Sequence, residues 1–117
     1  MLGWKRICRL ENNGFTRLYG MLGFAMRAGK IILGADRVAS ALPEKGNGAV
    51  RLVLLAADAS DGTKKRLTYK CEFYKKEIIV IPLKAEELGA RLGKLFAPAV
   101  LAITDDRFAE EIKKSLG

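Results

Sequence analysis

The sequence predicts an α/β protein, a three-layer α/β/α sandwich with a small four-stranded mixed sheet. Its 117 residues are the length of one domain, and half of them are apolar, which favours a single folded core. Short apolar runs typical of buried strands alternate with longer segments of helical periodicity, as in layered α/β folds. The predicted strands are Ile31–Leu33, Val50–Ala56, Ile78–Ile81 and Ala99–Thr104.

The first helix is predicted over Arg17–Ala28, where apolar residues recur at the spacing of one helical face. Gly29 is placed to end this helix, and the first strand follows. Gly34 then permits a sharp change of direction into a second helix over Asp36–Leu42, which Pro43 ends. The apolar positions of the first helix are Leu18, Met21, Leu22, Ala25 and Met26.

The second half of the chain continues the alternation. The second strand is an uninterrupted apolar run, which predicts burial on both of its faces. A third helix directs Leu67, Cys71 and Tyr74 inward and its basic side chains outward, and Lys84–Leu92 is predicted to be the fourth helix. Asp105 is expected to cap the last helix. The apolar face of that helix consists of Phe108, Ala109, Ile112 and Leu116.

The chain is predicted to consist of a basic N-terminal arm, residues 1–13, and a single domain, residues 14–117. The arm mixes basic residues among its apolar ones, unlike a signal peptide, and no apolar stretch is long enough to span a membrane. Cys8 and Cys71 are far apart and match no metal-binding or redox spacing, which fits a reducing cytoplasm.

The net charge of +8 is concentrated in two segments. Residues 1–30 contain six basic side chains and one acidic side chain, and residues 63–76 have the same composition. A concentrated positive field attracts polyanions, because phosphate contacts release counterions. The charge is therefore consistent with a nucleic acid as partner, without deciding for it. The alternative is a solvated basic surface that keeps the protein in solution.

The side chains that many enzymes need are missing. The chain has no histidine, which excludes a histidine triad, a histidine base and a histidine metal site. Its glycines form neither a dinucleotide fingerprint nor a phosphate-cradling loop. Asp58 and Asp61 suit a turn, and Asp105 with Asp106 suits a helix cap, so a Mg²⁺ cluster is the minor alternative. We predict a binding module and not an enzyme, with no catalytic residue, no metal and no cofactor.

The second helix begins with an acid and a base side by side, Asp36 and Arg37. The free N–H groups and the dipole at a helix start favour phosphate or the acceptor edge of a base. Arg37 could grip a phosphate or a guanine, and Asp36 could accept from guanine or cytosine amino groups. In the alternative interpretation, Asp36 is only the N-cap and Arg37 is a solvated side chain.

Four segments together resemble the kink-turn RNA-binding ribosomal protein family, that of archaeal L7Ae and eukaryotic L30e. They read LGFAMRAGKIILGADRVASAL, RLVLLAADASDGTKKRL, CEFYKKEIIVIPLKAEELGARLGK and AVLAITDDRFAEEI. The sequence is most similar to the small bacterial YlxQ-like branch of that family, and the resemblance covers about residues 15–116. It implies a three-layer sandwich that binds kinked RNA stems containing tandem sheared G·A pairs.

The family's recognition turn has the form Gly-x-Asn-Glu-x-x-x-Lys, with Lys-Gln replacing Asn-Glu in some branches. Asp36 stands at the Asn position and keeps the acceptor without the amide donor, whereas Arg37 at the Glu position can only donate. Ala41 stands at the Lys position, with Ser40 nearest to it. The resemblance therefore implies the docking turn but not the standard reading of G·A pairs. The turn residues carried over are Gly34, Ala35, Asp36, Arg37 and Ser40.

The resemblance and the basic segments together predict further RNA contacts outside this turn. We expect Lys30, Lys64 and Lys94 to meet RNA, the last of them through a phosphate. Phe96 lies with Lys94 in the segment Gly93–Ala99, which corresponds to the family's second RNA-facing loop. Its ring could stack on an extruded base or belong to the core.

The predicted function is that of a cytoplasmic, non-catalytic RNA-binding protein, associated with the ribosome and docking on a structured RNA with a kink or an internal loop. No membrane partner is expected. Two alternatives stay open. One is a protein-interaction or scaffold module that kept the fold and lost base recognition. The other is a separate RNA-binding appendage acting with an RNA methyltransferase.

Overall fold

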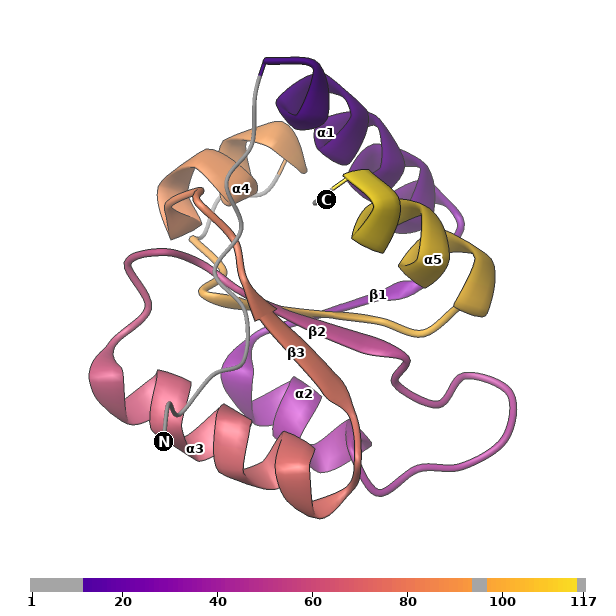
Figure 1. Cartoon of the computed structure of the whole chain (residues 1–117), viewed down its shortest axis with the longest axis vertical. Coiled ribbons are helices and arrows are strands. Elements are labelled where there is room, and N and C mark those ends of the chain that lie inside the picture. The colour runs from indigo at the N-terminus through magenta and orange to yellow at the C-terminus, as the bar shows by residue number, and fades with distance from the viewer. Residues whose placement is uncertain (1–11, 94–96, 116–117) are drawn as a thin grey trace.

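The computed structural model describes residues 12–93 and 97–115, with side chains from residue 17 onward. In this part of the chain, four strands form one mixed sheet, and five helices cover its two faces (Figure 1). The predicted three-layer α/β/α sandwich is confirmed. The elements are α1 (Asn12–Arg27), β1 (Ile31–Leu33), α2 (Ala35–Ala41), β2 (Leu52–Leu55), α3 (Asp61–Phe73), β3 (Glu77–Val80), α4 (Ala85–Arg91), β4 (Val100–Ile103) and α5 (Asp106–Ser115).

The strand order is β1-β4-β2-β3, so the last strand of the chain is inserted between the first two. β4 is antiparallel to both neighbours, and Ile103 lies opposite Ile31 of β1 and Leu52 of β2. β2 and β3 are parallel. Because β4 runs against β1 and β2, its first residues lie beside the last residues of those two strands.

The two faces of β2 contribute to two separate hydrophobic clusters. Leu52 and Leu54 pack with residues of α1, α4 and α5, whereas Val53 and Leu55 pack with residues of α2 and α3. Figure 1 shows the same division, with α1, α4 and α5 on one side of the sheet and α2 and α3 on the other. All four side chains of β2 are fully buried, which confirms the predicted burial on both faces.

Two predicted helix boundaries are confirmed by their hydrogen bonds. Gly29 has a φ of 72°, and the Lys30 N–H donates to the Ala25 carbonyl at 2.8 Å, which closes the end of α1 as a glycine stop does. The Asp105 carboxylate accepts from the backbone N–H of Phe108 at 3.1 Å at the start of α5. Asp105 therefore caps α5, as its sequence position predicts.

Other boundaries differ from the sequence-based expectation. α1 begins at Asn12, five residues earlier than predicted, because the turn-like composition Asn-Asn-Gly is a weak preference that helical context overrides. The last two residues of the predicted arm thus belong to a helix. Residues 1–11 and Leu116 lie outside the described residues. β2 is shorter than predicted, although Arg51 and Ala56 on either side of it still donate to backbone carbonyls of the β4 segment.

Cys71 lies on the face of α3 that packs against the sheet. Its side chain is fully buried, and this burial raises the pKa of the thiol from its usual 9.0 to about 12, although nearby Lys76 partly opposes the shift. The neutral thiol is therefore the form that the folded protein favours. Since an unfolded thiol ionises first, this contribution to stability is lost as the pH rises from 9.0 toward about 12.

The packing of Cys71 predicts a protected thiol. In a Cys8→Ser variant, which leaves Cys71 as the one cysteine, we expect no measurable reaction with a thiol-reactive dye near pH 8 while the protein is folded. The same variant unfolded in guanidinium chloride should react fully. Fast labelling of a variant whose circular dichroism spectrum is native would show that α3 does not bury this thiol.

Candidate nucleic-acid interface

Three chain segments meet at one edge of the sheet, where β1 and β2 end and β4 begins. The Gly34 N–H, directly after β1, donates to the Val100 carbonyl at 2.9 Å. The Ala56 N–H, directly after β2, donates to the Ala99 carbonyl at the same distance. These bonds fix the turn after β1, the loop after β2 and the segment before β4 to one another. In open α/β sheets, loops gathered at one end of the strands are the usual place for ligands.

The turn from β1 into α2 depends on Gly34. Its φ of 98° and ψ of 143° lie in a region that only glycine adopts easily. Gly34 takes the N-cap position of α2, and its carbonyl accepts from the Val38 N–H at 3.0 Å. Glycine has no side chain with which to cap the helix, and the structure shows no side-chain cap from the described residues. Within the described part of the chain, the first N–H groups of α2 are therefore left for solvent or a ligand.

Asp36 is not the N-cap, so the capping interpretation of this residue is wrong. It lies inside the first turn of α2, where its Oδ1 accepts from Nη2 of Arg66 on α3 at 2.9 Å. The Asp36 side chain is 91% exposed and that of Arg66 45% exposed, so water screens the pair and it contributes little to stability. Its structural effect is to connect the start of α2 with α3 and to offset the charge of Asp36.

Arg37 lies on the exposed side of the same helical turn. Among the residues that the structure describes, its guanidinium has no hydrogen-bond or ion-pair partner. An open groove of about 540 Å³ runs along α2 beside it. The structure thus brings Asp36, Arg37 and Ser40 together, as predicted. The groove is lined by Ile32, Asp36, Arg37, Ser40, Ala41, Glu44 and Gly48.

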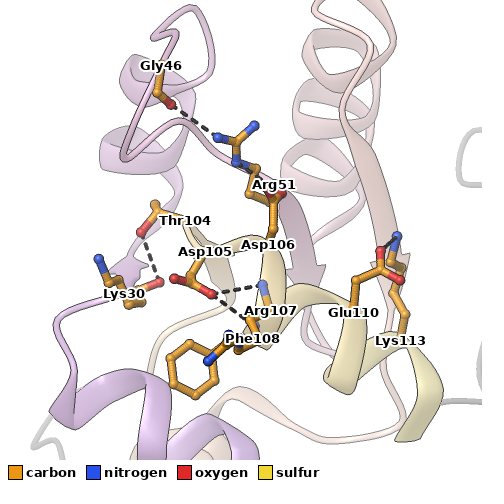
Figure 2. Close-up of polar contacts among 10 residues, drawn as sticks. All are labelled: Lys30, Gly46, Arg51, Thr104, Asp105, Asp106, Arg107, Phe108, Glu110 and Lys113. Carbon is orange, nitrogen blue, oxygen red and sulfur yellow. Dashed lines mark hydrogen bonds and ion pairs between the residues drawn. The ribbon is translucent and has the colours of Figure 1, made fainter.

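Lys30 is separated from this turn by the length of β1. Its carbonyl accepts from the Thr104 hydroxyl at 3.2 Å, at the opposite edge of the sheet (Figure 2). The region around it contains both basic and acidic side chains, and several of them already bond within the protein. Arg51, for example, donates from Nη2 to the Gly46 carbonyl at 3.2 Å and forms an ion pair with Asp106. This second cavity, of about 410 Å³, is lined by Lys30, Asn47, Gly48, Arg51, Thr104, Asp105, Asp106 and Arg107.

Lys64 and Asp58 have internal partners at the loop after β2. The Lys64 ammonium donates to the Ala57 carbonyl at 3.0 Å, which ties the first turn of α3 back to this loop. The Asp58 carboxylate accepts from the Ala85 N–H at 2.9 Å, at the start of α4. Both charged groups therefore shape the loop. Lys94 and Phe96 lie outside the described residues. Gly93, the last described residue before them, has a φ of 70° and lies just after the end of α4.

Two findings concern features absent from the described residues, 12–93 and 97–115. No group of three or more His, Cys, Asp or Glu side chains there is arranged to hold a metal ion. No helix within these ranges is long and apolar enough to cross a membrane.

Sequence reasoning missed two residues that organise this edge. Arg66 reaches Asp36 from 30 positions away, and no local pattern could reveal that contact. Ser60 is the N-cap of α3, and its hydroxyl oxygen accepts from the Thr63 N–H at 3.1 Å. A serine directly before a polar helix start is a recognisable signal of an N-cap, so this second residue was within reach of the sequence.

The sandwich, the inserted β4 and the uncapped turn define a class: small α/β/α binding modules whose loops gather at one sheet edge. The chain belongs to the ribosomal protein L7Ae/L30e/S12e/Gadd45 family, whose model matches residues 16–113. It is 39% identical over 97 residues to the RNA-binding protein YlxQ of Bacillus subtilis (strain 168), covering 80% of this chain and 89% of that protein. The RNA-binding protein YlxQ of Enterococcus faecium is 34% identical over 95 residues, with coverages of 80% and 85%.

Solved structures show the same fold. A protein with unknown function from Bacillus halodurans C superposes with a TM-score of 0.75 at 31% identity, covering 86% of this chain and 96% of that one. The Giardia lamblia 15.5kD RNA binding protein superposes with a TM-score of 0.71 at 19% identity, covering 92% and 88%. At that identity, the second similarity concerns the fold alone.

The backbone at Gly34 predicts opposite effects for two glycine substitutions. A Cβ at Gly34 or at Gly20 of α1 would meet no atom within 4 Å, so neither substitution creates a clash, and backbone conformation decides the sign of its effect. We expect Gly34→Ala to lower the free energy of unfolding by about 1–3 kcal/mol, because its φ of 98° strains any other residue.

The matched variant Gly20→Ala should raise the free energy of unfolding by about 0.5–1 kcal/mol, because alanine is the better helix former. Urea unfolding followed by circular dichroism measures both variants. Equal effects at the two sites would show that the turn does not depend on glycine.

Proposed function

We propose that this protein is a non-catalytic RNA-binding protein that docks a kinked or internal-loop RNA on the edge where β1 and β2 end. The observation that carries the proposal is Arg37, which has no partner among the described residues, beside the glycine-capped start of α2 at that edge. The family and the similarity to RNA-binding proteins of Bacillus subtilis and Enterococcus faecium support RNA as the ligand. A ribosomal RNA is the proposed partner, which would place the protein in the cytoplasm with the ribosome.

The chemistry of the turn favours a donor-based contact. Arg37 can bond a phosphate or the O6/N7 edge of guanine with its planar fork, and the first N–H groups of α2 add further donors. Ser40 lines the same groove and can donate or accept. Asp36 accepts from Arg66 through Oδ1, and its other oxygen is still able to accept, so the pair Asp36–Arg37 would present an acceptor followed by donors to an RNA. This differs from an Asn-Glu pair, in which the second residue is the acceptor.

The other predicted contacts have different roles in this proposal. Lys64 would shape the loop after β2 and contribute its charge from there, since its ammonium already bonds to Ala57. An RNA docked on the turn reaches Lys30 only if it also extends along β1. Lys94 and Phe96 remain proposed contacts for a phosphate and for an extruded base.

A protein-interaction module is the second candidate, and the engaged carboxylate of Asp36 is the observation that favours it. If base recognition is lost, the same edge would serve a protein partner. Purified cellular complexes distinguish the two candidates. A partner retained after nuclease treatment by the Arg37→Ala protein would support the protein-interaction function.

The proposed function predicts selective RNA binding. We expect the protein to bind a kinked stem with tandem G·A pairs more tightly than the same stem with Watson–Crick pairs, in titrations followed by fluorescence anisotropy. Affinity for both RNAs should fall as salt rises. Equal affinity for the two stems at two salt concentrations would contradict specific recognition of the kink.

Arg37→Ala should weaken binding of the kinked stem by about five- to a hundredfold if the side chain reads a base. If the side chain contacts only phosphate, the slope of log affinity against log salt should instead change by about one, with a uniform loss across sequences. Arg107→Ala is the matched control, because it removes the same charge from an exposed arginine at the opposite edge. Equal losses for both variants would indicate a general charge effect.

A further inference from the structure

Two aromatic rings are exposed on the outer face of α3. Tyr69 is 77% exposed and Phe73 is 76% exposed. They are four residues apart on one helix, so their side chains are neighbours on the same face. Isolated exposed apolar residues are ordinary on protein surfaces, but two adjacent large rings at this exposure indicate a surface that meets a planar or apolar ligand.

The helix beneath these rings is well fixed. On the opposite face of α3, Leu67 and Cys71 are fully buried in the cluster shared with β2 and β4. The Phe73 ring lies edge to face with the Tyr74 ring, with centroids 4.9 Å apart and planes at 88°. Tyr74 packs against the same buried cluster. The Phe73 ring is therefore supported from behind while its exposed area stays open.

The charges around the rings favour an anionic ligand. Lys65 precedes Tyr69 by one helical turn in the same row, and Arg66 and Lys70 form the adjacent row. Residues 63–76 contain six basic side chains and one acidic side chain. Lysine is depleted in the cores of protein–protein interfaces, whereas rings interleaved with basic side chains suit a strand of stacked bases and phosphates. The charge complements a polyanion with planar groups.

The rings and their basic neighbours are continuous with the turn after β1. Arg66 bonds to Asp36, next to Arg37, and so connects the start of α2 with the basic row of α3. We propose that the α3 surface, made of Lys65, Arg66, Tyr69, Lys70 and Phe73, binds single-stranded RNA. Bases stack on the two rings and phosphates meet the lysines. That this strand continues from an RNA docked at the turn rests on the proposed function, whereas the single-strand site itself does not.

Stacking is tested with two oligomers of equal length and charge, one carrying bases and one abasic. We expect the wild-type protein to bind the oligomer with bases more tightly than the abasic one. The double variant Tyr69→Ala with Phe73→Ala should lose that preference, because each ring should contribute a factor of at least about five to the affinity for bases. Lys65→Ala with Lys70→Ala should weaken binding of both oligomers. Anisotropy titrations at fixed salt measure the affinities.

Phe24→Ala is the matched control, because Phe24 is 55% exposed on α1, across the sheet from α3. It should leave the preference for bases unchanged. The thermal midpoints of all variants should stay near that of the wild type, since the substituted rings are exposed. A ring-deleted protein that keeps the full preference, or a wild type that binds both oligomers equally, overturns the proposal and leaves a protein partner as the occupant of these rings.

A kinked stem with and without a single-stranded extension separates this site from the proposed function. The extension should increase the affinity of wild type, and the increase should be absent from the variant without the two rings. If the stem alone does not bind but the single strand does, the proposed docking at the turn fails and the α3 surface stands. If the stem binds and the extension adds nothing, the continuation of the strand onto α3 fails instead.

Discussion

The insertion of β4 between β1 and β2 is the constraint on which the rest of this structure depends. Because β4 runs against both neighbours, its first residues meet the ends of β1 and β2 at a single edge. The hydrogen bonds from Gly34 to Val100 and from Ala56 to Ala99 fix the three segments there. A change in the register of β4 would separate these loops and remove the surface. The position of the proposed binding edge thus follows from strand order and not from any one charged residue.

The two edges of the sheet differ in how much of their polar chemistry is already used. At the edge containing Lys30, both charges are present and Arg51, Asp105 and Thr104 bond within the protein. At the other edge, Asp36 is offset by Arg66, and Arg37 has no partner within the described ranges. An unpartnered guanidinium beside free backbone N–H groups attracts an anionic ligand more effectively than a region of internally matched charges. This difference favours the turn as the docking point.

The sequence predicts the parts of the fold that depend on local pattern. The run Leu52–Leu55, the stop at Gly29 and the cap at Asp105 could all be read directly, because burial, positive φ and capping each favour particular residue types. Contacts between distant segments could not be predicted in this way. The bond from Arg66 to Asp36 depends on how α3 packs beside α2, so the sequence did not show that Asp36 forms an interhelical pair. The exposed pair Tyr69 and Phe73 was within reach, since a four-residue spacing places both in the row of Lys65.

The most direct test of this account is an amide NMR titration of the full chain with a kinked stem RNA. We expect the largest shift changes at Gly34, Arg37 and Ser60, around the edge where β1 and β2 end. The amides of Arg51 and Arg107, at the opposite edge, should change little. Largest changes at Arg51 and Arg107, or no change at any amide on adding the RNA, would contradict the account.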